Sequence, residues 1–322
     1  MGLSSTRKLI GRIGRKAFYY ITAPTKLRIG EVEIQTTPGH PLHEYLRAIP
    51  LYDRFLGHLC SSFEAGDVVI DIGANIGDTA ASIVNANSGI TLVCVEPDQR
   101  FFDLLKTNAD KLRRSTNDIR LIQAFIWDTN ENIKIVKNSA GSTGHAIHDI
   151  SKGATEIPTL TYEELLTRVG SPVVKLVKID TDGFDYKILN AMRKYYEADP
   201  KIDRPLIFFE LQTYLNDLGF NDPLRSERKT LYMNVIKDLM ERGWDRYIVF
   251  DNFGAPMISG TDPDLVDQLI DYCFVCQTIN DRVTAYFYDV LLFPNEFASL
   301  VNQGLTKHLR RHLSSESGLN NT

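Results

Sequence analysis

The stretch Asp67-Val-Val-Ile-Asp-Ile-Gly-Ala-Asn-Ile-Gly-Asp-Thr79 decides the fold, because a short apolar run breaks in it at two glycines, Gly73 and Gly77. The apolar residues Val68 to Ile72 are typical of a buried parallel strand. The residues after Gly77 have the pattern of a helix that packs back on the sheet. The stretch therefore predicts a strand, a tight turn and a helix. In open α/β sheets, such turns bind ligands outside the carboxyl ends of the strands.

The next predicted strand, at residues 91–97, ends in an acidic residue, Glu96. A carboxylate at the end of the second strand is placed to accept hydrogen bonds from the two hydroxyls of a ribose. The dinucleotide pattern G-x-G-x-x-G is not met, because Ala74 and Asn75 follow Gly73 and the second glycine beside a pyrophosphate is missing. The sequence therefore favours an adenosine ligand without a pyrophosphate.

Asp71-x-Gly-x-Asn-x-Gly77 followed by Glu96 resembles the first two motifs of class I S-adenosylmethionine-dependent methyltransferases. In that family, the first acid and the glycines surround the methionine part of the cofactor, and the second acid binds the ribose. The resemblance implies an α/β fold with a Rossmann-like, mostly parallel sheet whose last strand is antiparallel, with helices on both faces and an N-terminal cap segment. It also implies S-adenosyl-L-methionine as the cofactor. The contacts expected from these motifs are Asp71, Gly73, Ala74, Asn75, Gly77, Asp78, Thr79, Glu96 and Pro97.

A third strand is predicted at residues 119–127, followed by Asp128 and a hairpin to residues 133–136. In class I methyltransferases, the end of this region faces the adenine. The resemblance therefore makes Phe125 and Asp128 candidate cofactor contacts, with Asp128 the partner of the adenine amine. The alternative for Asp128 is a solvated turn residue.

A fourth strand is predicted at residues 173–180, and it runs into an acidic turn. The segment Lys178-Ile-Asp-Thr-Asp-Gly-Phe-Asp185, with Thr159-Leu160 before the preceding helix, resembles the Lys-Ile-Asp-Val-Glu-Gly-x-Glu signature of the FkbM family of methyltransferases. Residues 205–210 are similar to that family's next block, and the resemblance covers about residues 50–295. In this chain, Asp182 and Asp185 replace the usual glutamates of the signature, so each of these side chains is shorter by one methylene.

The candidate reaction centre lies at the end of the fourth strand, which is the same edge of the sheet as the glycine turn and Glu96. A helix start with surface ion pairs is the alternative, and it suits Asp185 best. A lone histidine in the small-residue loop 139–145 is a further candidate base or substrate contact. The candidate catalytic residues are Lys178, Asp180, Asp182 and His145, and Asp180 is also a candidate cofactor contact.

The composition is that of an ordinary globular protein of 322 residues, with 43% hydrophobic and 24% charged residues. The net charge of −5 argues against a general nucleic-acid binder, which is usually basic. Four cysteines are too few for a disulfide scaffold, and their number suits a reducing cytoplasm. No histidine or cysteine cluster accompanies Cys273 and Cys276. The carboxylates of Asp180 and Asp182 suit Mg²⁺, but the sequence indicates no third ligand, so the predicted site includes no metal.

No stretch has the 18 or more apolar residues that span a bilayer, and the N-terminus lacks the apolar core of a signal peptide. A cytoplasmic protein is therefore expected. The first 30 residues are basic, with apolar residues interleaved. This pattern is typical either of a peripheral helix on an anionic membrane or of a solvated leader. The expected division is a leader and cap at 1–49, a methyltransferase domain at 50–304 and a tail at 305–322.

The FkbM resemblance implies transfer of a methyl group from S-adenosylmethionine to a hydroxyl oxygen of a small molecule or glycan. Such a displacement asks the protein to align the reactants and help remove the hydroxyl proton. One alternative is a non-catalytic module that binds the nucleoside cofactor and acts through a partner or a membrane surface. Another is a dinucleotide oxidoreductase. Titration with S-adenosylhomocysteine and with NAD separates these two alternatives from each other.

Overall fold

The computed structural model describes most of the chain between residues 25 and 313. The described residues are 25–38, 40, 42–49, 51–52, 54–113, 117–129, 134–136, 145–147, 157–181, 183–212, 225–279 and 287–313. The leader before residue 25, Asp182 and the tail after residue 313 lie outside them. Among the helices that the structure describes, none combines the length and the apolar character that crossing a membrane requires.

A central sheet of eight strands organises the described part of the chain. In spatial order its strands are β13 (Pro256–Gly260), β12 (Arg246–Asp251), β14 (Tyr288–Phe293), β11 (Leu206–Leu211), β10 (Val174–Ile179), β3 (Val68–Ile72), β4 (Thr91–Val95) and β5 (Asp118–Ile122). The pairs from β5 to β11 are parallel, whereas β14 is antiparallel to both β11 and β12. The predicted fold class, a mostly parallel α/β sheet with an antiparallel last strand, is confirmed.

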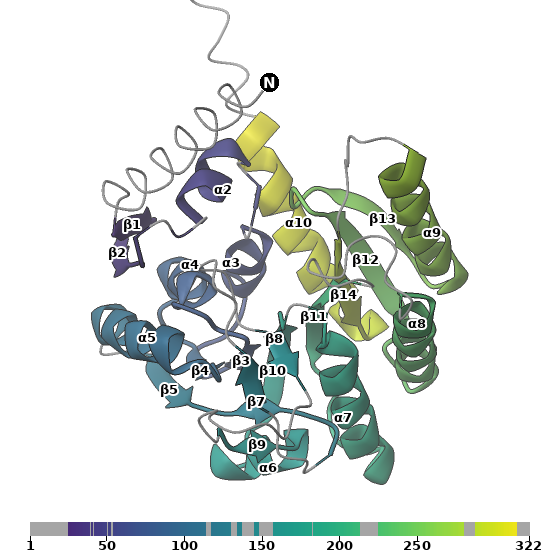
Figure 1. The fold of residues 1–322 in the computed structure, drawn as a ribbon, viewed down its shortest axis with the longest axis horizontal. Coiled ribbons are helices and arrows are strands. Elements are labelled where there is room, and N and C mark those ends of the chain that lie inside the picture. Colours follow the sequence, from purple (N-terminus) through teal and green to yellow (C-terminus); the bar gives the residue numbers. More distant parts are fainter. Residues whose placement is uncertain are drawn as a thin grey trace, which may run out of the picture.

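Helices cover both faces of this sheet (Figure 1). One face carries α3 (Phe55–Cys60), α4 (Asp78–Ala86), α5 (Gln99–Leu112) and α10 (Ala298–Leu313). The other carries α6 (Tyr162–Arg168), α7 (Asp185–Ala198), α8 (Arg225–Glu241) and α9 (Asp264–Ile279). The short helices α2 (Leu42–Ala48) and η1 (Asn295–Phe297) complete the helical elements of the described residues.

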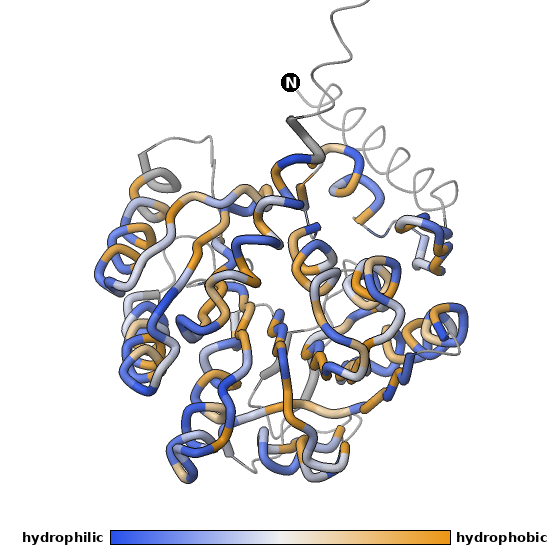
Figure 2. The backbone as a smooth tube through the Cα atoms, turned by 180° about the vertical axis from the view of Figure 1, so that it is seen from behind, coloured by the Kyte–Doolittle hydropathy of each residue, from blue (hydrophilic) through white to orange (hydrophobic). Residues whose placement is uncertain are grey.

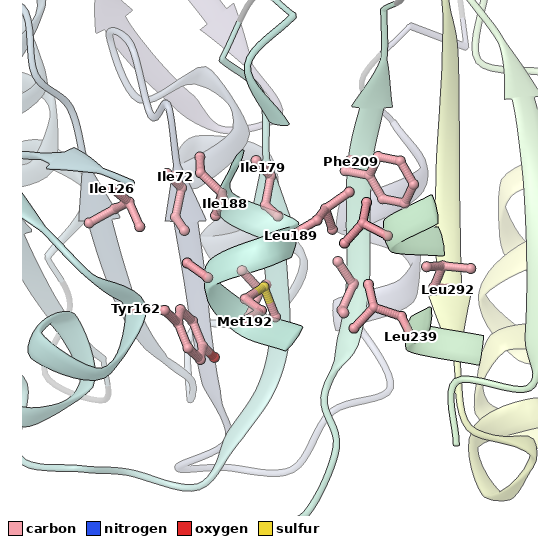
Figure 3. Close-up of a cluster of buried hydrophobic side chains, with 14 of the residues drawn as sticks. Ile72, Ile126, Tyr162, Ile179, Ile188, Leu189, Met192, Phe209, Leu239 and Leu292 are labelled. Carbon is pink, nitrogen blue, oxygen red and sulfur yellow. The ribbon is translucent and has the colours of Figure 1, made fainter. Parts of the chain in front are cut away.

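The strands are apolar because the helices bury them from both sides. All five residues of β3 are buried, as expected for a central parallel strand. Successive residues of a strand point to opposite faces of the sheet. Ile179 and Phe209 therefore pack against Leu189 of α7 (Figure 3), whereas Phe208 packs on the other face against Phe55, the first residue of α3. The hydropathy colouring in Figure 2 shows the same division, with hydrophobic residues along the inner strands and hydrophilic ones on the outer helical turns.

The N-terminal cap begins with an antiparallel hairpin of β1 (Lys26–Ile29) and β2 (Val32–Gln35). Asn108 of α5 fastens this hairpin, because its side chain donates to the Gln35 and Ile76 carbonyl oxygens at 2.9 and 2.8 Å and accepts from the Gln35 amide at 2.6 Å. The cap is therefore tied directly to the turn that follows β3.

The prediction of one strand over residues 119–127 is wrong. β5 ends at Ile122, and β6 (Phe125–Ile126) pairs instead with β9 (Thr159–Leu160). The chain leaves the sheet because Phe125 and Trp127 donate their amides to the carbonyls of Pro158 and Leu160. The predicted hairpin back to residues 133–136 is also corrected, since β7 (Lys134–Val136) pairs with β8 (His145–Ile147).

Candidate functional site

The turn after β3 brings the ends of β3 and β10 into close contact. Gly73 has φ of +80°, and a Cβ atom there would lie 1.8 Å from the backbone oxygen of Asp180. The Asp180 amide in turn donates to the Ile72 carbonyl oxygen at 3.0 Å. Only glycine fits this position, because it tolerates the left-handed conformation and leaves room for the neighbouring backbone.

The amides of this turn bond within the protein. Gly73 and Ala74 both donate to the Val95 carbonyl oxygen, at 2.9 and 3.0 Å, and Gly77 donates to Ala74. The hydrogen bonds of Gly73 and Ala74 fix the turn against the end of β4, and that of Gly77 closes the turn on itself. The cofactor contacts predicted for Gly73 and Gly77 stay predictions.

Glu96 joins three pieces of backbone at this edge. Its side chain accepts the Asn75 amide on Oε2 at 2.9 Å and the Asp98 amide on Oε1 at 2.8 Å. Glu96 is only 6% exposed, and burial raises the pKa of its carboxyl to about 7. Each oxygen keeps a lone pair beyond these bonds, so the carboxylate remains able to accept two hydroxyl donors.

Lys178 lies at the centre of the predicted reaction site. Its Nζ atom is 3.1 Å from Asp71 Oδ1, 3.1 Å from the Gly73 carbonyl oxygen and 3.3 Å from Asp180 Oδ2. Lys178 and Asp71 are neighbours in the β10–β3 register, and both are buried. Burial raises the pKa of Asp71, while the Lys178 ammonium opposes the rise. The ammonium thus links the glycine turn to Asp180.

The helix α4 begins at Asp78, directly after the turn. Burial raises the pKa of Asp78 to about 6, with the Lys178 charge acting in the opposite direction. Thr79, the next residue, is buried. Both predicted contacts therefore lie at the same edge of the sheet as Glu96 and Asp180, where the first turn of a helix favours negative groups.

Asp185 fixes the acidic turn after β10. Its Oδ2 atom accepts hydrogen bonds from the Thr181 hydroxyl at 3.0 Å and the Thr181 amide at 3.4 Å. Asp185 is the first residue of α7 and is fully buried, and burial raises the pKa of its carboxyl to about 7. These contacts agree with its interpretation as a helix-start residue. The role predicted for Asp182 stays a prediction.

Asp128 contacts α7 through its side chain. The Asn190 amide donates to its Oδ2 atom at 2.8 Å, and Lys187 Nζ lies 3.7 Å from its Oδ1 atom. Phe125 is half-buried in β6. The backbone of His145 lies in β8, and its side chain is outside the described residues.

The residue that follows β5 is Gln123, which sequence reasoning placed inside a strand. Its amide donates to Gln99 Oε1 at 3.0 Å and to the Pro97 carbonyl oxygen at 3.5 Å. Gln123 therefore stands beside the Glu96 corner, whereas Asp128 is held by α7. To identify Gln123 as a residue of this corner, the sequence analysis would have had to end the strand at Ile122.

The described residues show no metal centre. Among them, no group of three or more His, Cys, Asp or Glu side chains is arranged to hold a metal ion.

Replacing Gly73 with alanine is expected to lower the free energy of unfolding by about 2–5 kcal/mol, because a left-handed residue costs about 1–2 and overpacking about 1–3 kcal/mol. Denaturant titration measures the loss. Gly66→Ala is the matched control, since Gly66 has φ of +91° and nothing within 4 Å of an added Cβ. Equal losses in the two variants would contradict the close approach of β10.

Comparison with known proteins identifies the family. A family model described as methyltransferase FkbM domain matches residues 71–229. A curated relative, hexuronic acid methyltransferase AglP of Haloferax volcanii, is 27% identical over 135 residues, which are 42% of this chain and 53% of the relative. The chain thus spans about half the length of the curated relative it matches.

Two solved methyltransferase structures match the chain at low similarity. A precorrin-6y C5,15-methyltransferase from Geobacter metallireducens has 12% identity and a TM-score of 0.36, covering 75% of this chain and 87% of its own. The plantazolicin methyltransferase BamL, solved with S-adenosylhomocysteine, has 11% identity and a TM-score of 0.41, covering 78% and 86%.

The family match begins at Asp71, includes the glycine turn and Glu96, and extends through the Lys178–Asp185 segment. It thereby covers every residue of the edge described above, and it confirms the predicted methyltransferase motifs and the cofactor that they imply, S-adenosylmethionine. The division at residues 50 and 304 stays a prediction. Residues 71–229 of this chain therefore form a methyltransferase FkbM domain, the family that its motifs predicted.

Proposed function

We propose that this protein transfers a methyl group from S-adenosylmethionine to a hydroxyl oxygen of a small molecule or glycan. The observation that carries the proposal is the meeting of Gly73, Glu96, Lys178 and Asp180 at one edge of the sheet. The name of the Haloferax volcanii relative, which specifies a hexuronic acid, supports a sugar acceptor.

The residues at this edge fit the cofactor. Glu96 has lone pairs for two ribose hydroxyls, and Gln123, which donates to the Pro97 carbonyl oxygen, is a candidate contact for the base. Asp71 Oδ2 is buried without a hydrogen-bond partner, which suits a cationic or hydrogen-bond donor group beside it. When bound, S-adenosylmethionine supplies a methyl group on a sulfonium, which is electrophilic.

Asp180 is the candidate base for the acceptor hydroxyl. Its side chain is 50% exposed, so an acceptor can reach it, and its Oδ2 atom is held 3.3 Å from Lys178 Nζ. A carboxylate oriented in this way can take the hydroxyl proton as the methyl group transfers. Its position at the edge favours an enzyme over a module that only binds the nucleoside.

Glu96→Gln is expected to weaken binding of S-adenosylhomocysteine by about ten- to hundredfold, because a hydrogen bond to a charged group is worth about 1.5–3 kcal/mol. The measurement is isothermal calorimetry at pH 8, above the pKa of about 7 to which burial raises the Glu96 carboxyl. At that pH the wild-type group is mostly a carboxylate.

Glu241→Gln on the exposed end of α8 is the matched control and should bind like the wild type. Circular dichroism checks that both variants fold. Unchanged affinity in a folded Glu96→Gln protein would remove the ribose assignment, and tighter binding of NAD than of S-adenosylhomocysteine by the wild type would favour the oxidoreductase.

A further inference from the structure

One histidine of the N-terminal cap lies against the glycine turn and the start of α5. His40 is between β2 and α2, well before residue 71, where the family match begins. Its side chain is 9% exposed, and its ring meets the ring of Phe101 edge-on, with the centroids 6.4 Å apart. Phe101 belongs to the first turn of α5, which begins just after Glu96 and Asp98. His40 is therefore buried near the corner that Glu96 holds, although it lies outside the matched segment.

Backbone contacts fix the cap directly beside Asn75. Asn108 of α5 bonds both to Gln35 of the cap and to Ile76, the residue that follows Asn75. The backbone amide of His40 donates to a carbonyl oxygen three residues before it, at 3.1 Å. The place of His40 relative to the turn is thus set by contacts that do not involve its imidazole.

The hydrogen bonds of the imidazole define which nitrogen carries the proton. The Leu42 amide donates to His40 Nδ1 at 3.3 Å, and a nitrogen that accepts a hydrogen bond carries no proton. Burial lowers the pKa of His40 below its usual value, so the neutral ring prevails at pH 8. The one proton of the neutral ring is therefore on Nε2, on the side of the ring away from α2.

Asn75 offers an acceptor for that proton. Within the part of the chain that the structure describes, Asn75 Oδ1 is buried and makes no hydrogen bond of normal geometry. A buried polar atom of this kind calls for an explanation. Burial lowers the pKa of His40, and the Asn75 side chain opposes this shift, as an acceptor beside an imidazole N–H does. The side chains of His40 and Asn75 are therefore complementary neighbours.

The backbone of Asn75 supports the corner to which the ribose is assigned. Its amide donates to Glu96 Oε2 at 2.9 Å, while the other carboxylate oxygen accepts the Asp98 amide. Asn75 has φ of +47°, a left-handed conformation that residues other than glycine keep only where their surroundings hold it. A hydrogen bond to the Asn75 side chain would therefore also hold its backbone amide on Glu96.

We propose that His40 is a positioning residue for the cofactor: its Nε2–H donates to Asn75 Oδ1, and this bond keeps the Asn75 amide on the Glu96 carboxylate. The inference rests on the proposed function, which assigns the two ribose hydroxyls to Glu96. It extends the cofactor site of this protein from the matched segment into the N-terminal cap.

The test compares two conservative variants of the full chain by calorimetry with S-adenosylhomocysteine at pH 8. The shorter side chain of His40→Asn keeps an oxygen at the place of Nδ1 for the Leu42 amide but does not reach Asn75. The longer side chain of His40→Gln keeps an N–H donor at the place of Nε2. His40→Asn should weaken binding about three- to tenfold, the usual net effect of one hydrogen bond, whereas His40→Gln should bind nearly like the wild type.

A double-variant comparison shows whether His40 acts through Asn75. Asn75→Gly removes Oδ1 but keeps the backbone amide and tolerates the left-handed conformation. It should weaken binding at least as much as His40→Asn does. Adding His40→Asn to Asn75→Gly should cause no further loss, because the bond is already absent, whereas independent contributions would add.

His43→Asn is the matched control, since it changes a second histidine of the cap. His43 Nε2 lies 3.1 Å from Thr36 Oγ1, inside the cap, so this variant should bind S-adenosylhomocysteine like the wild type. Melting curves check that each variant folds. Where His40→Asn does not fold, His40→Ser provides another short acceptor for the Leu42 amide and is expected to show the same loss of affinity.

Several outcomes would overturn the role of His40. They are wild-type affinity in a folded His40→Asn protein, equal losses in His40→Asn and His40→Gln, additive losses in the double variant, and an equal loss in His43→Asn. Each of these leaves the proposed function standing as long as the wild type binds S-adenosylhomocysteine. Failure of the wild type to bind it would instead remove the proposed function.

Discussion

Asp180→Asn is expected to slow methyl transfer by about 10²–10⁴-fold while S-adenosylmethionine binds normally, because general-base help is worth that much in rate. Asparagine keeps the size of the side chain and an oxygen that can face Lys178 Nζ, which lies 3.3 Å from Asp180 Oδ2. It loses the ability to take a proton. Single-turnover transfer of labelled methyl to an identified acceptor measures the rate, and calorimetry measures the binding.

Asp185→Asn is the matched control. The carboxyl of Asp185 is buried and its pKa is raised to about 7, so a neutral amide is a close replacement, and its oxygen can still accept the Thr181 hydroxyl. The variant should turn over nearly as fast as the wild type. Asp182→Asn tests the second predicted carboxylate. Near wild-type rates in both Asp180→Asn and Asp182→Asn would place the base elsewhere, with His145 the next candidate.

The sequence predicted best those strands that helices cover on both faces. The apolar runs at β3 and β10 predicted central strands because helices cover both faces of a parallel sheet. The edge strand β13 had no such signal, since its exposure alternates and it starts with a proline. The split of residues 119–127 was missed because apolar residues continue from Leu121 and Ile122 of β5 to Phe125 and Ile126 of β6, and only the tertiary pairing of β6 with β9 separates the two strands.

The sequence predicted which residues lie at the edge of the sheet, but it did not predict the contacts between their side chains. Topology alone brings Gly73, Glu96 and Asp180 together, because parallel strands end at the same edge. The contact of Lys178 with Asp71 depends on the register of β10 against β3, which the hydrophobic pattern of a strand buried on both faces does not specify.

Lys178→Met is expected to lower the free energy of unfolding by about 3–5 kcal/mol, because removing one partner of a buried ion pair leaves an uncompensated charge. The side chains of Lys178 and Asp71 are 7% and 0% exposed, and their charged atoms are 3.1 Å apart. Such a loss is a large part of the 5–15 kcal/mol that usually stabilises a domain. Urea titration followed by circular dichroism measures it, and a loss below about 1 kcal/mol would contradict a buried, interacting pair.

The loss in Lys178→Met should also grow with pH. Burial already raises the pKa of Asp71 above 3.8 in the folded protein, and without Lys178 nothing opposes the rise. The folded variant then holds a proton that the unfolded chain releases as the pH passes about 4, so the free energy of unfolding falls as the pH rises. The deficit should therefore be larger at pH 8 than at pH 5. In the double variant Asp71→Asn, Lys178→Met, no buried charge remains, so most of the stability should return and the difference between the two pH values should disappear.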